Sequence, residues 1–240
     1  MKYKINYIIS LFSFLFFTGC LRTYYPALYQ SSASPMILER NDSIKNVKRY
    51  YSADVTLSKG NYENESLQIL RGSYIIVDTR EHVNFNTKVF GYTGIYHVSG
   101  LENYDGSKSI IGLGGEFGFN LNFKIKSVKI GAGISGGVTG ELGSYYTFRS
   151  SADKENKINS EPGPVFFTLS VFPIIAYESS ESSIFSAQIN LGLPGFISPN
   201  IVFNKNGYVY WLSWIPEDRN MNSSLGGRYV FGFMMNADLF

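Results

Sequence analysis

The sequence has one cysteine, Cys20, and two histidines, His82 and His97. A lone cysteine cannot close a disulfide within the chain, so the fold must hold without one. The two imidazoles have no acidic or thiol neighbours at the spacing of a metal site, and we expect no metal and no cofactor. Beyond the first residues, no apolar run reaches the roughly 20 residues of a membrane-spanning helix.

Neither sign of charge is in clear excess, because the chain has 21 Lys and Arg residues against 19 Asp and Glu residues. Removal of Lys2 and Lys4 with an N-terminal signal would leave equal numbers. A protein that binds nucleic acid normally presents a basic face, so we expect no nucleic-acid partner. The chain is rich instead in glycine, phenylalanine and tyrosine, with 24, 19 and 18 residues, which suits β-structure.

Residues 1–19 have the layout of a secretory signal peptide. Lys2 and Lys4 give a basic start, an apolar run covers residues 7–17, and small residues precede Cys20. The apolar run is short for a spanning helix, which needs about 20 residues. An N-terminal membrane helix, or an ordinary signal peptide beside a chance cysteine, are the alternative interpretations.

The sequence Phe-Thr-Gly-Cys at residues 17–20 resembles the lipobox of bacterial lipoproteins. The resemblance implies cleavage just before Cys20, whose sulfur takes a diacylglycerol and whose new amino group takes a further acyl chain. Buried acyl carbons contribute about 0.8 kcal/mol per CH₂, so several chains anchor stably. Prolines and serines without a sustained period predict a flexible, lipidated tether over residues 20–49, ahead of a domain over residues 50–240.

After the tether, apolar residues alternate with polar or small ones, as in strands that have two different faces. The clearest segments are 109–125 and 128–149, whose apolar residues fall on opposite parities. Pairing them across a turn at residues 126–127 brings the two apolar faces together, as a hairpin register requires. This register sets Lys124 opposite Lys129, which is tolerable only near water or beside an acidic partner.

The alternation predicts an all-β fold, an antiparallel up-and-down β-barrel of about eight strands, with short and long connections in turn. The expected strands are residues 50–58, 66–77, 83–98, 109–125, 128–149, 164–177, 184–193 and 228–239. The expected long connections are residues 58–65, 99–107, 150–163 and 194–227, and the short ones are 78–82, 126–127 and 178–183. Long extracellular loops and short periplasmic turns are typical of bacterial outer-membrane barrels.

The last strand ends in "YVFGFMMNADLF", with the aromatic Phe240 at the terminus. Together with the alternation, this ending resembles a small eight-stranded outer-membrane barrel of the OmpA/OmpX type. The resemblance implies a protein of the cell outer membrane, in contact with its lipid and anchored through Cys20. An even number of strands would leave both chain ends on the periplasmic side, with Cys20 at the inner leaflet.

In lipid the apolar face of a closed sheet must point outward, so charged side chains on the polar faces turn into the lumen. We expect a polar network there, formed by Glu116, Lys129, Glu141, Arg149, Arg228 and Asp238. Two tryptophans, Trp211 and Trp214, lie in the long segment 194–227. They suit an interfacial aromatic belt or a surface contact with a partner.

These observations favour a non-enzymatic outer-membrane lipoprotein barrel with an envelope-structural or surface-interaction role. Its partner, extracellular or periplasmic, is not specified by the sequence. The first alternative is a lipid-anchored periplasmic barrel, similar to a lipocalin, whose apolar face points inward around an apolar ligand. The lesser alternative is a lipid-modifying outer-membrane enzyme that uses His97 with Asp105 and either Ser99 or Ser107.

Overall fold

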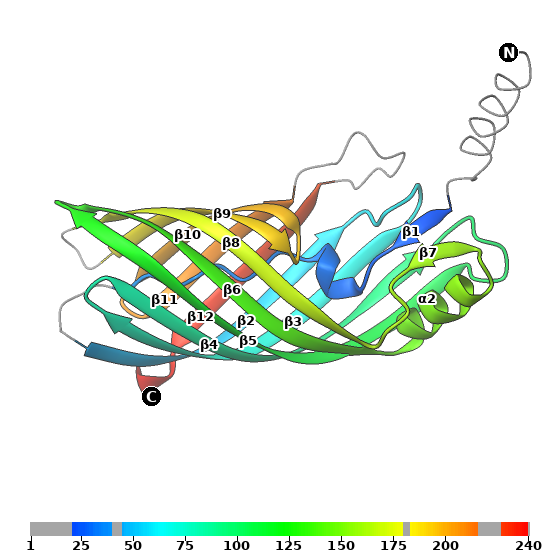
Figure 1. Ribbon diagram of the computed structural model, residues 1–240, viewed down its shortest axis with the longest axis horizontal. Coiled ribbons are helices and arrows are strands. Elements are labelled where there is room, and N and C mark those ends of the chain that lie inside the picture. The colour runs from blue at the N-terminus through cyan, green and yellow to red at the C-terminus, as the bar shows by residue number, and fades with distance from the viewer. Residues whose placement is uncertain (1–20, 40–44, 180–182, 216–226, 240) are drawn as a thin grey trace, which may run out of the picture.

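A computed structural model describes residues 21–39, 45–179, 183–215 and 227–239. The expected signal peptide, the acylation site Cys20 and the terminal Phe240 lie outside the described residues. The structure is a closed antiparallel β-barrel of ten strands, which confirms the predicted fold class (Figure 1). The wall strands are β2 (Lys45–Ser58), β3 (Ser66–Arg80), β4 (Val83–Val98), β5 (Gly106–Ile125), β6 (Val128–Leu142), β8 (Val165–Glu178), β9 (Ser183–Leu193), β10 (Phe196–Lys205), β11 (Tyr208–Ile215) and β12 (Arg228–Asn236).

Neighbouring wall strands are consecutive along the chain, and the last of them, β12, closes the barrel by pairing with the first, β2. Closure removes the unpaired strand edges that an open sheet would expose. The long connections share one end of the barrel, called here the loop end. The connections at residues 81–82, 126–127, 179–182 and 206–207 share the other end, called the turn end, and one short connection, residues 194–195 between β9 and β10, lies at the loop end.

The expected strand number was too low because β10 and β11 lie within the segment predicted as a long loop, residues 194–227. Asn206 and Gly207 join these strands in a two-residue turn, with positive φ angles of 54° and 83°. Asparagine and glycine tolerate this left-handed backbone, which matches the twist of a hairpin. The hairpin forms part of the barrel wall because β10 pairs with β9 and β11 with β12.

The predicted hairpin of β5 and β6 is confirmed, with Lys124 opposite Lys129 and Ile125 opposite Val128. The predicted continuation of its second strand to residue 149 is wrong, because β6 ends at Leu142 and helix α2 (Ser144–Lys154) follows. Gly143, with φ of 103°, breaks the strand. The buried face of α2 has the helical spacing that follows from 3.6 residues per turn, with members Tyr145, Phe148, Arg149 and Ala152.

The outward face of the barrel is apolar, and all ten wall strands contribute to it. Its exposed members include Tyr51, Val55, Leu70, Val89, Ile95, Leu113, Phe117, Phe119, Ile130, Val138, Phe167, Leu169, Val171, Ile175, Phe185, Ile189, Ile201, Leu212, Trp214 and Phe231. Buried polar side chains point the other way, into the lumen. This arrangement is the reverse of a calyx, which would bury its apolar face.

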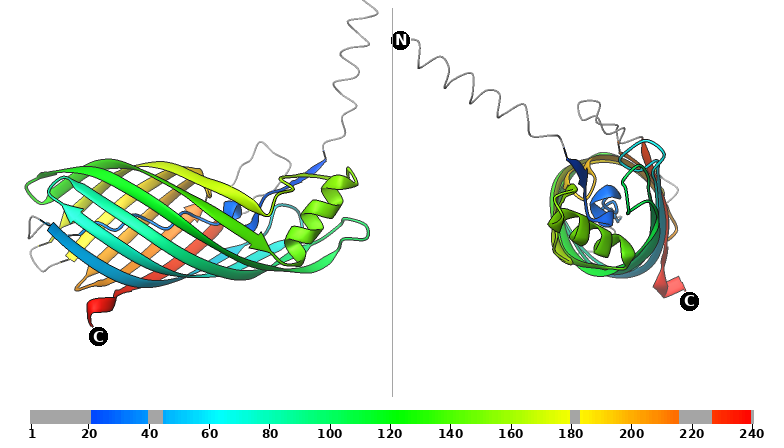
Figure 2. Two further views of the ribbon diagram at one scale, coloured as in Figure 1. Left: turned by 60° about the horizontal axis from the view of Figure 1, so that its bottom comes forward. Right: turned by 90° about the vertical axis from the view of Figure 1, so that its right-hand side faces the viewer.

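Residues 21–39 run through the lumen from the loop end to the turn end, and they are called here the plug (Figure 2). At the loop end, β1 (Arg22–Tyr24) pairs in parallel with β7 (Ile158–Ser160), which follows α2. The short helix η1 (Ala27–Gln30) comes next, and the plug reaches Glu39 near the turn end. In the end-on view, η1 lies within the ring of strands and α2 crosses the mouth.

The plug differs from the flexible tether expected for this segment. Its apolar side chains, among them Tyr24, Leu28 and Ile37, are buried in clusters with lumen-facing residues of the wall. The plug also changes the expected placement of the chain ends, because Arg22 lies at the loop end whereas Asn236 and η2 (Ala237–Leu239) lie at the turn end. Within the described residues, no helix has the length and apolar character that crossing a membrane requires.

Candidate functional site

At the loop end, the plug and α2 are held to the wall through one buried carboxylate, that of Glu141 on β6. One oxygen of Glu141 accepts a hydrogen bond from Arg149 Nη2 at 2.7 Å, and the other accepts one from the backbone N–H of Ala27 at 2.6 Å. Both charged side chains are fully buried. Arg149 also donates to the backbone oxygen of Glu161 at 2.7 Å, which fixes the segment after β7.

A second carboxylate at the same end, Glu65, binds the first residues of the plug. Tyr24 and Tyr96 each donate a hydroxyl hydrogen bond of 2.6 Å to Glu65, and Arg22 lies 3.9 Å from it. Tyr24 lies on β1, outside the barrel wall, and burial, reinforced by Glu65, raises its pKa far above the usual value. The phenol therefore remains a hydrogen-bond donor at every physiological pH.

The middle of the lumen is polar and charged. Arg71 and Asp54 form a buried ion pair at 2.9 Å, and Arg71 also donates to the backbone oxygen of Ser32 in the plug at 3.3 Å. Lys88 and Glu116 form a second pair at 3.0 Å. Polar groups of the wall thus hold the plug along its length as well as at its ends.

At the turn end, Glu39 of the plug accepts hydrogen bonds from Lys48, at 2.5 Å, and from Tyr50. The buried Lys129 donates to the backbone oxygen of Glu39 at 2.8 Å and lies 2.6 Å from the carboxylate of Glu178. Lys124 contacts the same carboxylate. Glu178 is therefore the acidic partner that the facing lysines of the β5–β6 hairpin require.

The structure brings only some of the predicted lumen residues together. Lys129, Glu141, Arg149 and Arg228 are buried, Glu116 is half-buried, and Asp238 is exposed. Arg228 donates to Asn61 at 2.8 Å. Asp238 lies outside the lumen, 3.7 Å from Arg49, because β12 ends at Asn236 and η2 carries the chain away from the wall.

The sequence did not identify other lumen charges, namely Glu39, Asp54, Glu65, Arg71, Lys88 and Glu178. Asp54 has a signal in the sequence, because it alternates with the apolar residues Ala53 and Val55 of its strand. Glu39 gave no such signal, because it lies in the segment expected to be a tether. The two tryptophans separate: Trp211 is buried in the lumen, and Trp214 points outward.

The residues considered for catalysis do not assemble into a triad. His97 Nδ1 lies 3.4 Å from Ser107 Oγ. Asp105 instead accepts the backbone N–H of Leu101 at 2.7 Å, and Ser99 contacts Arg22 through its backbone oxygen. His82 pairs with Glu81 at 3.7 Å. The described part of the chain contains no cluster of three or more His, Cys, Asp or Glu side chains that could hold a metal.

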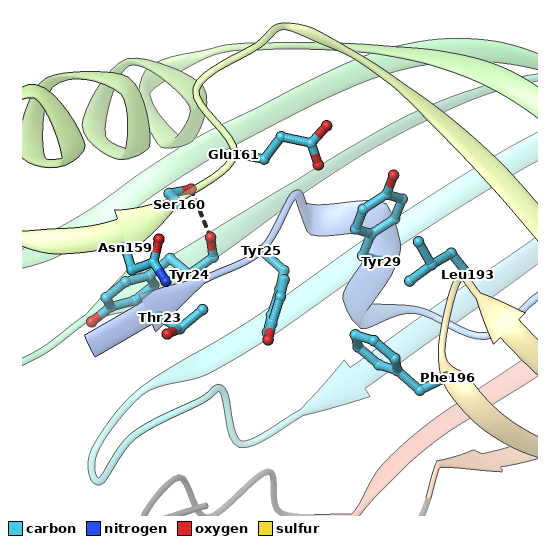
Figure 3. Close-up of a pocket in the computed structure, with 9 residues that line it drawn as sticks. All are labelled: Thr23, Tyr24, Tyr25, Tyr29, Asn159, Ser160, Glu161, Leu193 and Phe196. Atoms are coloured by element: carbon cyan, nitrogen blue, oxygen red, sulfur yellow. Dashed lines mark hydrogen bonds between the residues drawn. The ribbon is translucent and has the colours of Figure 1, made fainter. Parts of the chain in front are cut away.

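A cavity of about 420 Å³ lies at the loop end between the plug, the segment after α2 and the β9–β10 turn (Figure 3). Its volume is in the range of small-molecule sites. Four of its residues come from the plug, three from the segment at β7 and two from the turn. The lining residues are Thr23, Tyr24, Tyr25, Tyr29, Asn159, Ser160, Glu161, Leu193 and Phe196.

Aromatic rings form much of this cavity. Tyr25 and Phe196 meet edge to face, with ring centroids 5.6 Å apart, although one comes from the plug and the other from β10. Tyr29 packs on Phe166 at 4.9 Å and donates its hydroxyl to the backbone oxygen of Phe167 at 2.6 Å. Burial, together with the negative charge of Glu161, raises the pKa of Tyr29 to about 12.

Comparison with known proteins finds no matching protein family and no matching curated protein. Among solved structures, Neisserial surface protein A is 11% identical over 79% of this chain and 98% of its own, with a TM-score of 0.28. A mutant of the Rh. blastica porin is 8% identical over 80% of this chain and 99% of its own, with a TM-score of 0.23. Because these identities and TM-scores are low, the function of the chain is argued below from its own residues.

Proposed function

We propose that the chain is a non-enzymatic outer-membrane barrel, closed by its own N-terminal plug, with an envelope-structural or surface-interaction role. The observation that carries the proposal is the apolar outward face on all ten wall strands. A soluble protein rarely exposes contiguous apolar patches larger than a few hundred Å². In a bilayer the same face is buried in hydrocarbon. Closure of the barrel gives the backbone N–H and C=O groups of each wall strand hydrogen-bond partners on neighbouring strands.

The rival interpretation, a periplasmic calyx for an apolar ligand, needs the opposite arrangement of faces. Here the lumen contains ion pairs such as Arg71–Asp54, and the plug occupies the space a ligand would take. The lipid-modifying enzyme is likewise unsupported, because Asp105 is committed to Leu101 and does not orient His97. We therefore favour neither alternative.

The loop end suits the outer side of the membrane. Connections of two residues at the turn end are typical of the periplasmic side, and long connections that carry extra structure, such as α2 and β7, are typical of the outside. The loop-end surface is thus the region where a partner would bind. Among the predicted partner residues, Trp214 lies on the outward face of β11, where it suits the interfacial belt.

The lipid anchor at Cys20 is part of the proposal and is supported by the Phe-Thr-Gly-Cys sequence. The nearest described strand, β1, lies at the loop end. That favours an anchor in the leaflet on the same side, in place of the inner leaflet expected from the sequence. Metabolic labelling with a fatty acid should be lost in Cys20→Ser, and labelling that persists would contradict the anchor.

Membrane insertion is tested by the mobility of the protein on an SDS gel with and without boiling. Folded membrane barrels stay compact until boiled, and we expect the native chain to show the shift after reconstitution into vesicles. Phe119 lies near the middle of the outward apolar run Ile111–Ile125, so Phe119→Lys should cost about 2–4 kcal/mol in the bilayer. Phe119→Leu is the control, and equal folding of both variants in vesicles would contradict insertion.

A further inference from the structure

We propose that the cavity at the mouth of the barrel binds an organic cation with an apolar body, such as an alkylated ammonium group. This site would specify what the proposed surface-interaction role recognises. The inference rests on that proposed role only in assuming that the ligand arrives from the loop end. The cavity combines aromatic rings with one carboxylate, that of Glu161. Cations are attracted to the faces of such rings and to such a charge.

The aromatic part of the cavity is assembled from distant parts of the chain and held in place. Tyr25 and Tyr29 belong to the plug, whereas Phe196 begins β10. The backbone N–H of Gly195 donates to the backbone oxygen of Tyr29 at 3.0 Å, which ties the turn to the plug. The rings are therefore positioned before a ligand arrives, which lowers the cost of ordering them on binding.

Glu161 differs from the acidic residues that belong to the plug or bind it. Glu65, Glu141 and Glu39 each have a basic side chain within 3.9 Å. Within the described residues, no basic side chain forms an ion pair with the Glu161 carboxylate, which is exposed at the cavity. Arg149 fixes the backbone of Glu161, which keeps the residue at the cavity near Tyr29, whose pKa is raised by burial and by the charge of Glu161. Its negative charge is available to a ligand.

Two of the hydroxyl groups at the cavity are already committed within the protein, which reduces what the cavity can offer a carbohydrate. Sugars need several free donors and acceptors in addition to aromatic faces. Ser160 Oγ already donates to the backbone oxygen of Tyr24 at 2.6 Å and accepts from Arg149 at 3.2 Å. The Tyr29 hydroxyl is committed to Phe167. The side chains of Thr23, Tyr25 and Asn159 add neutral polar groups, and the one charged group of the lining is the Glu161 carboxylate, which favours a cationic ligand.

The wall of the barrel is low on the side where the cavity lies. Strand β8 begins at Val165, but its pairing with β9 begins only at Leu169, opposite Leu193. Residues 165–168 therefore rise beyond the β9–β10 turn, and the turn forms a step in the rim. Leu193 and Phe196, which line the cavity, flank that step. A ligand can approach there without displacing α2 from the mouth.

The proposal is tested by calorimetric titration of the full folded chain in maltoside micelles with phenyltrimethylammonium. We expect saturable binding that its neutral isostere, tert-butylbenzene, does not reproduce. Glu161→Gln should weaken binding about two- to five-fold, as expected for an exposed charge pair. Phe196→Leu should weaken it by a similar factor through the lost ring.

The matched control is Glu102→Gln, which removes an exposed acid at the same end of the barrel but away from the cavity. It should bind as the native chain does, and each variant's fold is verified by its gel shift on boiling. Absence of saturable binding, equal binding of the neutral isostere, or equal affinity of Glu161→Gln and the native chain would each overturn the proposal. Because the titration needs no bilayer, its failure is distinct from failure of membrane insertion.

Discussion

Replacing Glu141 by glutamine tests whether one buried carboxylate holds three parts of the molecule together. Glu141 and Arg149 are both fully buried and 2.7 Å apart, so the substitution leaves a buried guanidinium without its counter-charge. Removing one partner of a buried pair typically costs about 3–5 kcal/mol. We expect about 3 kcal/mol, because glutamine can still accept from Ala27, and Arg149 keeps its bonds to Ser160 and Glu161.

The cost is measured by urea unfolding in micelles, with Arg149→Met and the double variant completing a thermodynamic cycle. The double variant should lose less than the sum of the two single losses, since it leaves no unpaired charge. Glu155→Gln, which breaks the exposed pair of Glu155 with Lys157 at 2.8 Å, is the control and should have a far smaller effect. Strict additivity, or equal losses for Glu141→Gln and Glu155→Gln, would refute the assigned role of Glu141.

Two further predictions concern the turn end and the packing of the lumen. Glu178→Gln should lower the free energy of unfolding by about 3 kcal/mol, because it leaves the buried Lys129 without its counter-charge. Lys124→Met should lower it much less, because Lys124 is half-exposed. The reverse order in urea unfolding would contradict the assigned contacts. Gly232→Ala places a Cβ 1.9 Å from the Trp211 ring and should cost about 1–3 kcal/mol, whereas Gly115→Ala meets nothing closer than 3.6 Å. Equal thermal stability of these two glycine variants would argue against the position of Trp211.

The sequence predicted the barrel and its best hairpin because the side-chain period of a strand is directly visible in residues 109–125. The prediction failed at α2, because the apolar residues of 143–149 fit the spacing of a helix as well as that of a strand. Gly143, with its positive φ angle, ends the strand before the helix begins. The strands β10 and β11 were missed as wall strands for a different reason. The Asn-Gly pair at residues 206–207 is a hairpin signal, but a local signal does not show whether the hairpin belongs to the barrel wall or extends beyond it.

The plug could not be predicted from local pattern. An extended segment inside a lumen is buried on all sides, so it has neither the period of a strand nor that of a helix. Its polar residues find partners only in the closed barrel, as Glu39 does with Lys48 and Ser32 does through Arg71. The same holds for the mouth cavity, whose Tyr25 and Phe196 lie far apart in the sequence and meet only in the folded chain.

The measurement that most directly tests the account is cysteine labelling from outside intact cells with a reagent that cannot cross the envelope. Both positions are introduced in a Cys20→Ser background with a substitute anchor. Lys154→Cys, on α2 at the loop end, should react on intact cells, whereas Ser127→Cys, at the turn end, should react only after the outer membrane is opened. If Lys154→Cys stays silent until the membrane is opened, although the gel shift shows a folded barrel, the proposed orientation across the outer membrane is wrong.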